Sequence, residues 1–203
     1  MCSWCWGFAQ VLAALETELP PEIPLQFVMG GLSADTNTPM DQSIRTYVQD
    51  NWRSVEATTG ASFNWEFWDQ CNPRRSTYPA CRAVIAAALC GKGPAMFHAI
   101  QRAYYLEARN PSDIETLVEL AVDLELNSNQ FRTSIQSVEV EALLQRDFDT
   151  RRKLGANQFP TLLFGPSIES NLDQNPGQTI LLARGYAPSN RVLDAFRRAY
   201  EKL

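Results

Sequence analysis

The sequence has a single histidine, His98, and no apolar stretch long enough to cross a membrane. A cysteine hydrolase would need that histidine as its base, yet His98 lies in no recognisable catalytic motif, so we expect a structural or exposed residue. No basic segment followed by an apolar run marks a secretory signal at the N-terminus. The sequence therefore predicts a soluble, cytoplasmic protein.

Concentrated positive charge is also missing. The 18 Lys and Arg residues are outnumbered by 23 Asp and Glu residues, which gives a formal net charge of −5, and the basic residues form no block. Nucleic-acid-binding domains usually carry a basic patch or stripe. We therefore expect neither nucleic acid nor a membrane as a partner.

A second closely spaced pair of cysteines is absent as well. Of the five cysteines, only Cys2 and Cys5 are close in sequence, whereas closed zinc sites need two such pairs. Because five is an odd number, at least one thiol stays free in any monomer. We expect no metal site. Inert thiols are the simpler account of Cys71 and Cys81, although these two could form a secondary redox pair, and the role of Cys90 does not follow from the sequence.

The most informative motif that is present is Cys2-Ser3-Trp4-Cys5. Apolar residues follow it at helical spacing until Pro20, which places the motif at the start of a helix. Residues three apart share one helix face, so the two sulfurs could form a small disulfide ring. The helix N-terminus favours a thiolate at the first cysteine. Cys2 is the candidate nucleophile and Cys5 the resolving cysteine. The alternatives are half a zinc site, a structural disulfide or two inert buried thiols.

The rest of the chain divides into three blocks. Residues 24–31 form a short apolar run typical of a buried strand, and Thr38-Pro39 opens a helix that ends near Gly60. Residues 61–138 show only helical periodicity, with a capping box at residues 112–115 as the clearest helix start.

The last block returns to an α/β pattern. A helix from about residue 138 stops at Gly155, strands are predicted at 159–165 and 178–184, and Ser189 caps a final helix. The sequence predicts an α/β, thioredoxin-like domain of residues 1–60 and 139–203, interrupted by an all-helical insertion of residues 61–138.

Four segments in this order, residues 2–8, 28–32, 73–83 and 158–164, resemble the DsbA-like branch of the thioredoxin superfamily, and within it the FrnE-like proteins. The resemblance implies a disulfide oxidoreductase or isomerase with a cis Pro160 packed against the active disulfide. It implies that Trp4 and the backbone of Phe159 contact the substrate, a protein or small molecule that carries a thiol or a disulfide. No bound cofactor is expected, and glutathione or a dithiol partner would be the reductant.

Two features depart from the family pattern. Ser3 and Trp4 place no cation beside Cys2, whereas strongly oxidising members carry a histidine there, so we expect a smaller lowering of the Cys2 pKa. In this fold a central strand leads directly into the Cys-x-x-Cys motif, but here Met1 precedes Cys2. We therefore expect the first central strand to be missing from this chain and to be encoded just upstream.

Three other functions fit parts of the sequence. Kappa-class glutathione transferases and hydroxychromene-carboxylate isomerases share this fold and bind glutathione, but they typically keep a single Ser or Cys, whereas Cys2 and Cys5 are both present. A non-catalytic, chaperone-like binding module is the second alternative. The third is an N-terminal nucleophile hydrolase, in which removal of Met1 exposes the α-amine of Cys2 as a base.

Further residues have a structural and a functional interpretation. An aromatic cluster is expected to form core rather than a substrate groove: Phe63, Trp65, Phe67 and Trp68. Arg74 and Arg75 either attract the carboxylates of a small thiol or are solvated surface residues. The direction of electron flow and the oligomeric state do not follow from the sequence.

Overall fold

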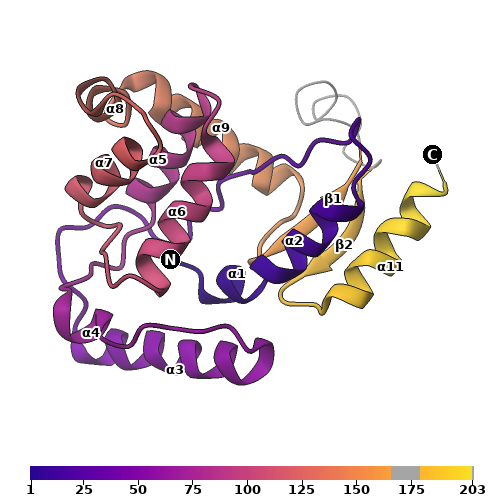
Figure 1. The fold of residues 1–203 in the computed structure, drawn as a ribbon, viewed down its shortest axis with the longest axis horizontal. Helices are drawn as coiled ribbons and strands as arrows, with labels where there is room; N and C mark the ends of the chain where they lie inside the picture. The colour runs from indigo at the N-terminus through magenta and orange to yellow at the C-terminus, as the bar shows by residue number, and fades with distance from the viewer. Residues whose placement is uncertain (166–178, 203) are drawn as a thin grey trace. The chain divides into compact units, whose positions relative to one another are not determined.

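The computed structural model describes residues 1–165 and 179–202 (Figure 1). Its elements, in chain order, are α1 (Ser3–Gly7), α2 (Ala9–Glu18), α3 (Gln42–Thr59), α4 (Phe67–Gln70), α5 (Tyr78–Ala88), α6 (Gly93–Tyr105), α7 (Ile114–Asp123), α8 (Ser128–Ser134), α9 (Val138–Lys153), β1 (Thr161–Phe164), β2 (Ile180–Arg184) and α11 (Ser189–Tyr200). Among these described helices, none is long and apolar enough to cross a lipid bilayer.

The chain divides into two compact units. Met29–Phe148, with Met1, form the helical unit, and Cys2–Val28 with Asp149–Leu203 form the sheet unit. This division differs from the predicted boundaries, because residues 29–60 and 139–148 group with the helical unit. For α3 the reason lies in Trp52, which is 0% exposed and packs against the Phe63, Trp68 and Tyr105 rings of the helical unit.

An aromatic core occupies the helical unit around Trp52. The Trp52 ring stacks on Phe63 at 4.8 Å between centroids and also meets Trp68 at 5.1 Å and Tyr105 at 5.5 Å. Phe67 is fully buried beside them. The cluster is therefore core, as the sequence predicted, because its rings bury one another and leave little aromatic surface for a substrate.

Helix α3 starts later than predicted. Asp41 is its N-cap, and the Asp41 carboxylate accepts a hydrogen bond from the Ile44 N–H at 2.8 Å. Pro39 instead forms an isolated antiparallel bridge with Arg74. The predicted end is confirmed at Gly60, whose φ of 73° lies in the left-handed region that glycine adopts easily.

The sheet unit contains the two strands predicted near the C-terminus. β1 and β2 pair antiparallel with an irregularity between Leu162 and Leu163, and the Gly185 N–H donates to the Pro160 carbonyl at 2.7 Å just beyond the pair. Gln178, the first residue of the second predicted strand, lies outside the described residues. In Figure 1, α2 and α11 lie next to the two strands.

Two apolar clusters join these helices to the strands. Their buried members come from α2, from the strands, from α11 and from Phe8, at the junction of α1 and α2: Phe8, Val11, Ala183 and Val192 in one, and Leu15, Phe164, Phe196 and Ala199 in the other. Phe8 and its neighbours in α2 thereby fix the end of the helix pair that carries the Cys-x-x-Cys motif. Ser189 is the first residue of α11 rather than its cap, which is Pro188.

The predicted strand at residues 24–31 is wrong: the structure assigns no strand there. The Met29 N–H donates to the Asp147 carboxylate at 2.9 Å rather than to a neighbouring strand. An apolar run becomes a strand only when its backbone groups pair with another strand. At Met29, a side chain of the same unit takes that place.

Candidate active site

Cys2 is the N-cap of α1, and its backbone is extended at φ −95° and ψ 107°. This conformation turns the side chain back over the first helical turn, where the Cys5 N–H donates to the Cys2 Sγ at 3.3 Å. The Cys2 carbonyl accepts from the Cys5 and Trp6 N–H groups at 3.1 and 3.3 Å. The predicted position of the motif at a helix start is therefore confirmed.

The pKa values of the two thiols of the motif are shifted in opposite directions. A hydrogen bond with the Cys5 thiol lowers the pKa of Cys2, supported by the backbone N–H groups of Cys5 and Trp4 and opposed by burial. The same thiol–thiol hydrogen bond, with burial and the charge on Cys2, raises the pKa of Cys5 well above its usual value. One sulfur is thus prepared to be a thiolate and the other to keep its proton.

The segment before β1 meets the motif. The Cys2 thiol lies 3.8 Å from the carbonyl oxygen of Phe159, to which the S–H can donate. The Phe159–Pro160 peptide bond is cis. Because proline has no backbone N–H, residue 160 provides no donor here. The carbonyl of Phe159 therefore faces the motif without a neighbouring N–H from residue 160. Cys2, Cys5, Phe159 and Pro160 all belong to the sheet unit.

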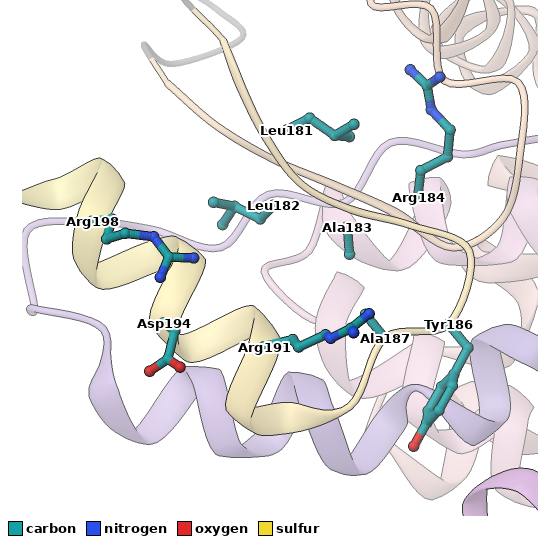
Figure 2. A pocket seen from close by; sticks show the side chains of 9 residues that line it. All are labelled: Leu181, Leu182, Ala183, Arg184, Tyr186, Ala187, Arg191, Asp194 and Arg198. Carbon is teal, nitrogen blue, oxygen red and sulfur yellow. The ribbon is translucent and has the colours of Figure 1, made fainter.

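Two side chains near the motif were not predicted. The Tyr186 ring, just after β2, lies 6.2 Å from the Trp4 ring between centroids, and Tyr186 also lines a hollow along β2 and α11 (Figure 2). The Arg151 guanidinium lies 5.9 Å from the centroid of the Phe159 ring. Both contacts join residues far apart in sequence, so no local pattern could have indicated them.

The remaining cysteines lie in the helical unit and are free thiols. Burial raises the pKa of Cys81 to about 11. Burial also raises the pKa of Cys71, whose thiol donates to the Ala108 carbonyl at 3.0 Å. Neither environment favours a thiolate, which agrees with the interpretation of these residues as inert.

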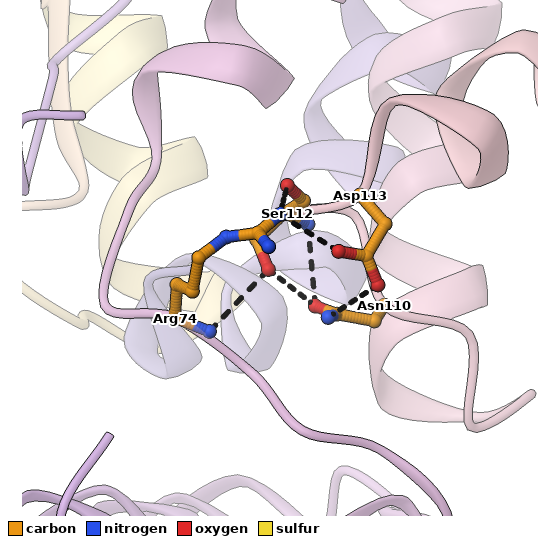
Figure 3. Close-up of polar contacts among 4 residues, drawn as sticks. All are labelled: Arg74, Asn110, Ser112 and Asp113. Carbon is orange, nitrogen blue, oxygen red and sulfur yellow. Dashed lines mark hydrogen bonds and ion pairs between the residues drawn. The ribbon is translucent and has the colours of Figure 1, made fainter. Parts of the chain in front are cut away.

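Arg74 holds the helical unit together rather than facing a ligand (Figure 3). Its guanidinium donates to the Asp113 carboxylate at 2.7 Å and to the Ser112 carbonyl. Asn110 donates to the other Asp113 oxygen at 2.8 Å and accepts from the Ser112 hydroxyl at 2.8 Å. The guanidinium of Arg75 lies over the Tyr47 ring at 5.3 Å.

The predicted capping box at residues 112–115 is therefore wrong. The N-cap of α7 is Asp113, and its side chain makes no cap hydrogen bond. Ser112 and Asp113 are bound by Asn110 and Arg74 instead, and Glu115 pairs with Arg132 at 2.5 Å. The sequence pattern was present, but long-range partners compete for the same side chains.

His98 lies beside Phe97 on α6, in the helical unit, at 5.3 Å between ring centroids. This places the one histidine in a different unit from the dithiol. Across residues 1–165 and 179–202, no group of three or more His, Cys, Asp or Glu side chains is arranged to hold a metal ion.

A dithiol at a helix start, beside the segment that enters a β-hairpin covered by helices, defines a protein of the thioredoxin-like fold. A family model described as thioredoxin matches residues 1–175, and the chain belongs to that family. Both findings confirm the predicted fold class.

Solved structures agree over the whole chain. A crystal structure of a candidate protein disulfide isomerase from Nitrosomonas europaea is 29% identical, with a TM-score of 0.84, and the match covers 100% of this chain and 94% of that one. The cytosolic disulfide reductase DsbM from Pseudomonas aeruginosa is 25% identical, with a TM-score of 0.74 and coverage of 100% and 93%. The same reductase with GSH has a TM-score of 0.75 at 24% identity and covers 100% and 96%.

Curated relatives are more distant. The ClpXP adapter protein SpxH of Bacillus subtilis is 23% identical over 167 residues, which are 81% of this chain and 55% of that protein. SpxH of Halalkalibacterium halodurans is 22% identical over 180 residues, 86% of this chain and 58% of that protein. The chain thus spans little more than half the length of the curated relatives it matches.

Proposed function

We propose that this protein is a thiol–disulfide oxidoreductase in which Cys2 is the nucleophile and Cys5 the resolving thiol. The observation that carries the proposal is the geometry at the start of α1, where the Cys5 N–H donates to the Cys2 Sγ at 3.3 Å and the Cys2 thiol lies 3.8 Å from the Phe159 carbonyl oxygen. In this geometry the pKa of Cys2 is lowered and that of Cys5 is raised. In such a pair one sulfur is the nucleophilic thiolate, and the other stays a protonated thiol until it resolves the mixed disulfide.

The reaction follows from this asymmetry. The Cys2 thiolate attacks one sulfur of a substrate disulfide, the substrate S–S bond breaks, and the leaving thiolate takes up a proton. Cys5 then loses its proton and attacks the Cys2 sulfur of the mixed disulfide, which releases the second substrate thiol. The substrate gains two electrons and two protons, and the protein is left with a Cys2–Cys5 disulfide.

A substrate segment would lie along residues 159–160. The Phe159 carbonyl, 3.8 Å from the Cys2 thiol, is placed to accept a backbone N–H from an extended segment next to the attacked sulfur. Pro160 offers no competing N–H. The Trp4 ring, half-buried against Tyr186, would contact the substrate on the other side of the motif.

The direction we propose is reduction, in the cytoplasm. Similarity to the cytosolic disulfide reductase DsbM supports it, and the absence of a cation at Ser3 and Trp4 agrees with a less oxidising couple. Reduction requires a reductant, which we propose is glutathione, the ligand bound to DsbM in one structure, or a dithiol partner. Membership of the FrnE-like branch stays a prediction.

A redox titration tests the proposal. The protein is equilibrated in buffers with an increasing ratio of oxidised to reduced glutathione, and free thiols are then alkylated. The alkylated fractions of Cys2 and Cys5 are quantified by peptide mass spectrometry. We expect both to lose label together in a two-electron transition, for which a tenfold change in the equilibrium constant is about 30 mV. Independent oxidation of the two, or a stable glutathione adduct at Cys2 that Cys5 does not displace, would contradict the proposal and favour a glutathione transferase or isomerase.

A further inference from the structure

A hollow of about 590 Å³ runs along β2 and α11 in the sheet unit, and neither Cys2 nor Cys5 is among the residues that line it. Its lining combines apolar residues of β2, three arginines and one aspartate (Figure 2). Figure 2 shows Leu181 and Leu182 on the strand, with Arg191 and Arg198 on the helix. The side chain of Arg184 points away from α11 in the same view.

The strand side of the hollow can accept another strand. Within the described residues, β2 pairs with β1 only, so its other edge has no strand partner. Unpaired edge groups are a template for an added strand. Leu181 is 45% exposed and Ile180 40% exposed, so an added strand would also cover apolar surface.

The helix side of the hollow carries two arginines and one aspartate. Positions 191, 194 and 198 lie on one face of α11. Asp194 is paired with Arg197 at 3.3 Å, and Arg197 also pairs with Glu18 at 2.7 Å. In the described part of the chain, by contrast, neither Arg191 nor Arg198 makes an ion pair, although acidic residues outnumber basic ones in the sequence as a whole.

We propose that this hollow binds an extended acidic segment of a partner protein as a strand added to the edge of β2. Backbone hydrogen bonds would supply the pairing. Side chains alternate between the two faces of a strand, and Leu182 packs toward α11 while Leu181 is exposed on the other face. Apolar side chains of the segment would therefore cover Leu181, and its carboxylates on the opposite face would meet Arg191 and Arg198. A basic or neutral segment lacks that last contribution. The proposal goes beyond the proposed redox activity, because the segment needs no cysteine.

Tyr186 connects the hollow to the Cys-x-x-Cys motif. Tyr186 lines the hollow and contacts the Trp4 ring at 6.2 Å between centroids. A segment bound along β2 would therefore end near α1. The surface would recognise a partner by acidic residues that alternate with apolar ones. This recognition is separate from the disulfide chemistry at Cys2.

Fluorescence anisotropy with a short synthetic peptide, in which glutamate alternates with valine, tests the proposal. We expect saturable binding that weakens with added salt, and that falls by at least about tenfold in the double variant Arg191→Glu/Arg198→Glu. The matched control, Arg53→Glu/Arg102→Glu, makes the same change in net charge at exposed sites of the helical unit and should bind like the original protein.

Two further probes separate strand addition from attraction by charge alone. A peptide with N-methyl groups on alternate residues keeps the carboxylates but loses backbone donors, and it should bind about tenfold more weakly. Amide hydrogen exchange should show new protection at alternate residues of β2, those whose N–H groups point away from β1, only with the unmodified peptide. The proposal is overturned by absence of binding, by equal binding of a lysine–valine peptide, by equal loss in both double variants, or by protection confined to other elements.

Because the peptide has no cysteine, its binding can be measured in Cys2→Ser as well. If Cys2→Ser binds the peptide as tightly as the original protein, peptide binding does not depend on the redox activity. The two proposals can then fail or succeed separately, whatever the redox titration shows.

Discussion

Cysteines occur in both units of this protein, and their surroundings differ. In the sheet unit, Cys2 receives hydrogen bonds at the start of α1 and its pKa is lowered. In the helical unit, burial raises the pKa of Cys71, and it raises that of Cys81 to about 11. The comparison teaches that desolvation opposes thiolate formation at Cys71 and Cys81, whereas oriented donors in the sheet unit stabilise the thiolate of Cys2.

The polar groups of the two units show the same contrast. In the helical unit, Arg74 is bound by Asp113, and Arg82 by Asp35 and Glu141 at 2.6 and 2.8 Å. In the sheet unit, Arg191 and Arg198 line a hollow. Arg74 and Arg82 are paired within their own unit, so we expect changes at these residues to affect stability and changes at Arg191 and Arg198 to affect binding.

The largest expected effect is the loss of activity in Cys2→Ser. A hydroxyl cannot form the mixed disulfide, so the rate of disulfide reduction should fall by roughly a thousandfold or more. The control is Cys90→Ser in the helical unit, where the thiol is exposed, and its rate should stay near that of the original protein. A comparable loss in Cys90→Ser would break the comparison.

Trp52→Ala should mainly weaken the helical unit. Its side chain is fully buried among aromatic rings, and removal of such a side chain typically costs about 3–5 kcal/mol of unfolding free energy. Urea denaturation followed by circular dichroism measures the change. At urea concentrations where the variant is still folded, the rate of Cys2 alkylation should be unchanged. A large change in that rate would show that packing in the helical unit affects the reactivity of Cys2 in the sheet unit.

A pair of glycine variants sharpens the stability side of the comparison. Gly31 and Gly60 both have positive φ, at 63° and 73°, but a Cβ at Gly31 would lie 2.3 Å from the Phe148 ring whereas one at Gly60 meets nothing within 4 Å. Gly60→Ala should cost about 1–2 kcal/mol for its conformation, and Gly31→Ala about 1–3 kcal/mol more for the overlap. Equal losses in denaturation would show that Phe148 moves aside freely.

Cys81 gives a smaller, purely chemical effect. Since its pKa is about 11, little thiolate forms at neutral pH, and iodoacetamide should label it slowly in the folded protein but readily in urea. Cys90, which is exposed, should be labelled in both states. Rapid labelling of Cys81 without urea would mean that the helical unit opens far more often than its buried core implies.

Local sequence patterns predicted much of this structure. The helix start at Cys2, the end of α3 at Gly60 and the strands β1 and β2 follow from capping, glycine and periodicity, which act over a few residues. The extended segment at residues 24–31 was predicted as a strand because an apolar run does not reveal whether it has a partner. Ser112 failed as a cap for a similar reason, since a distant arginine and its neighbours bind that region.

The candidate site could be predicted only in part. Cys2 and Cys5 came from the motif and the lowered pKa of Cys2 from the helix start, but Phe159 and Pro160 came from resemblance to a family. Nothing in the spacing places residue 159 beside residue 2. Tyr186 and Arg151 were missed because their contacts with Trp4 and Phe159 form only when the chain folds.

The most direct test of the central claim is the rate of alkylation of Cys2 and Cys5 against pH in the same reduced protein, resolved by peptide mass spectrometry. As pH rises through the pKa of Cys2, its thiolate fraction and its labelling rate should rise and then level off. We expect the midpoint for Cys2 to lie below the usual value for cysteine, about 8.5, while Cys5 remains slow throughout that range because its pKa is raised. Cys5 reacting first, or the two thiols sharing one midpoint, would contradict the assignment of nucleophile and resolving cysteine.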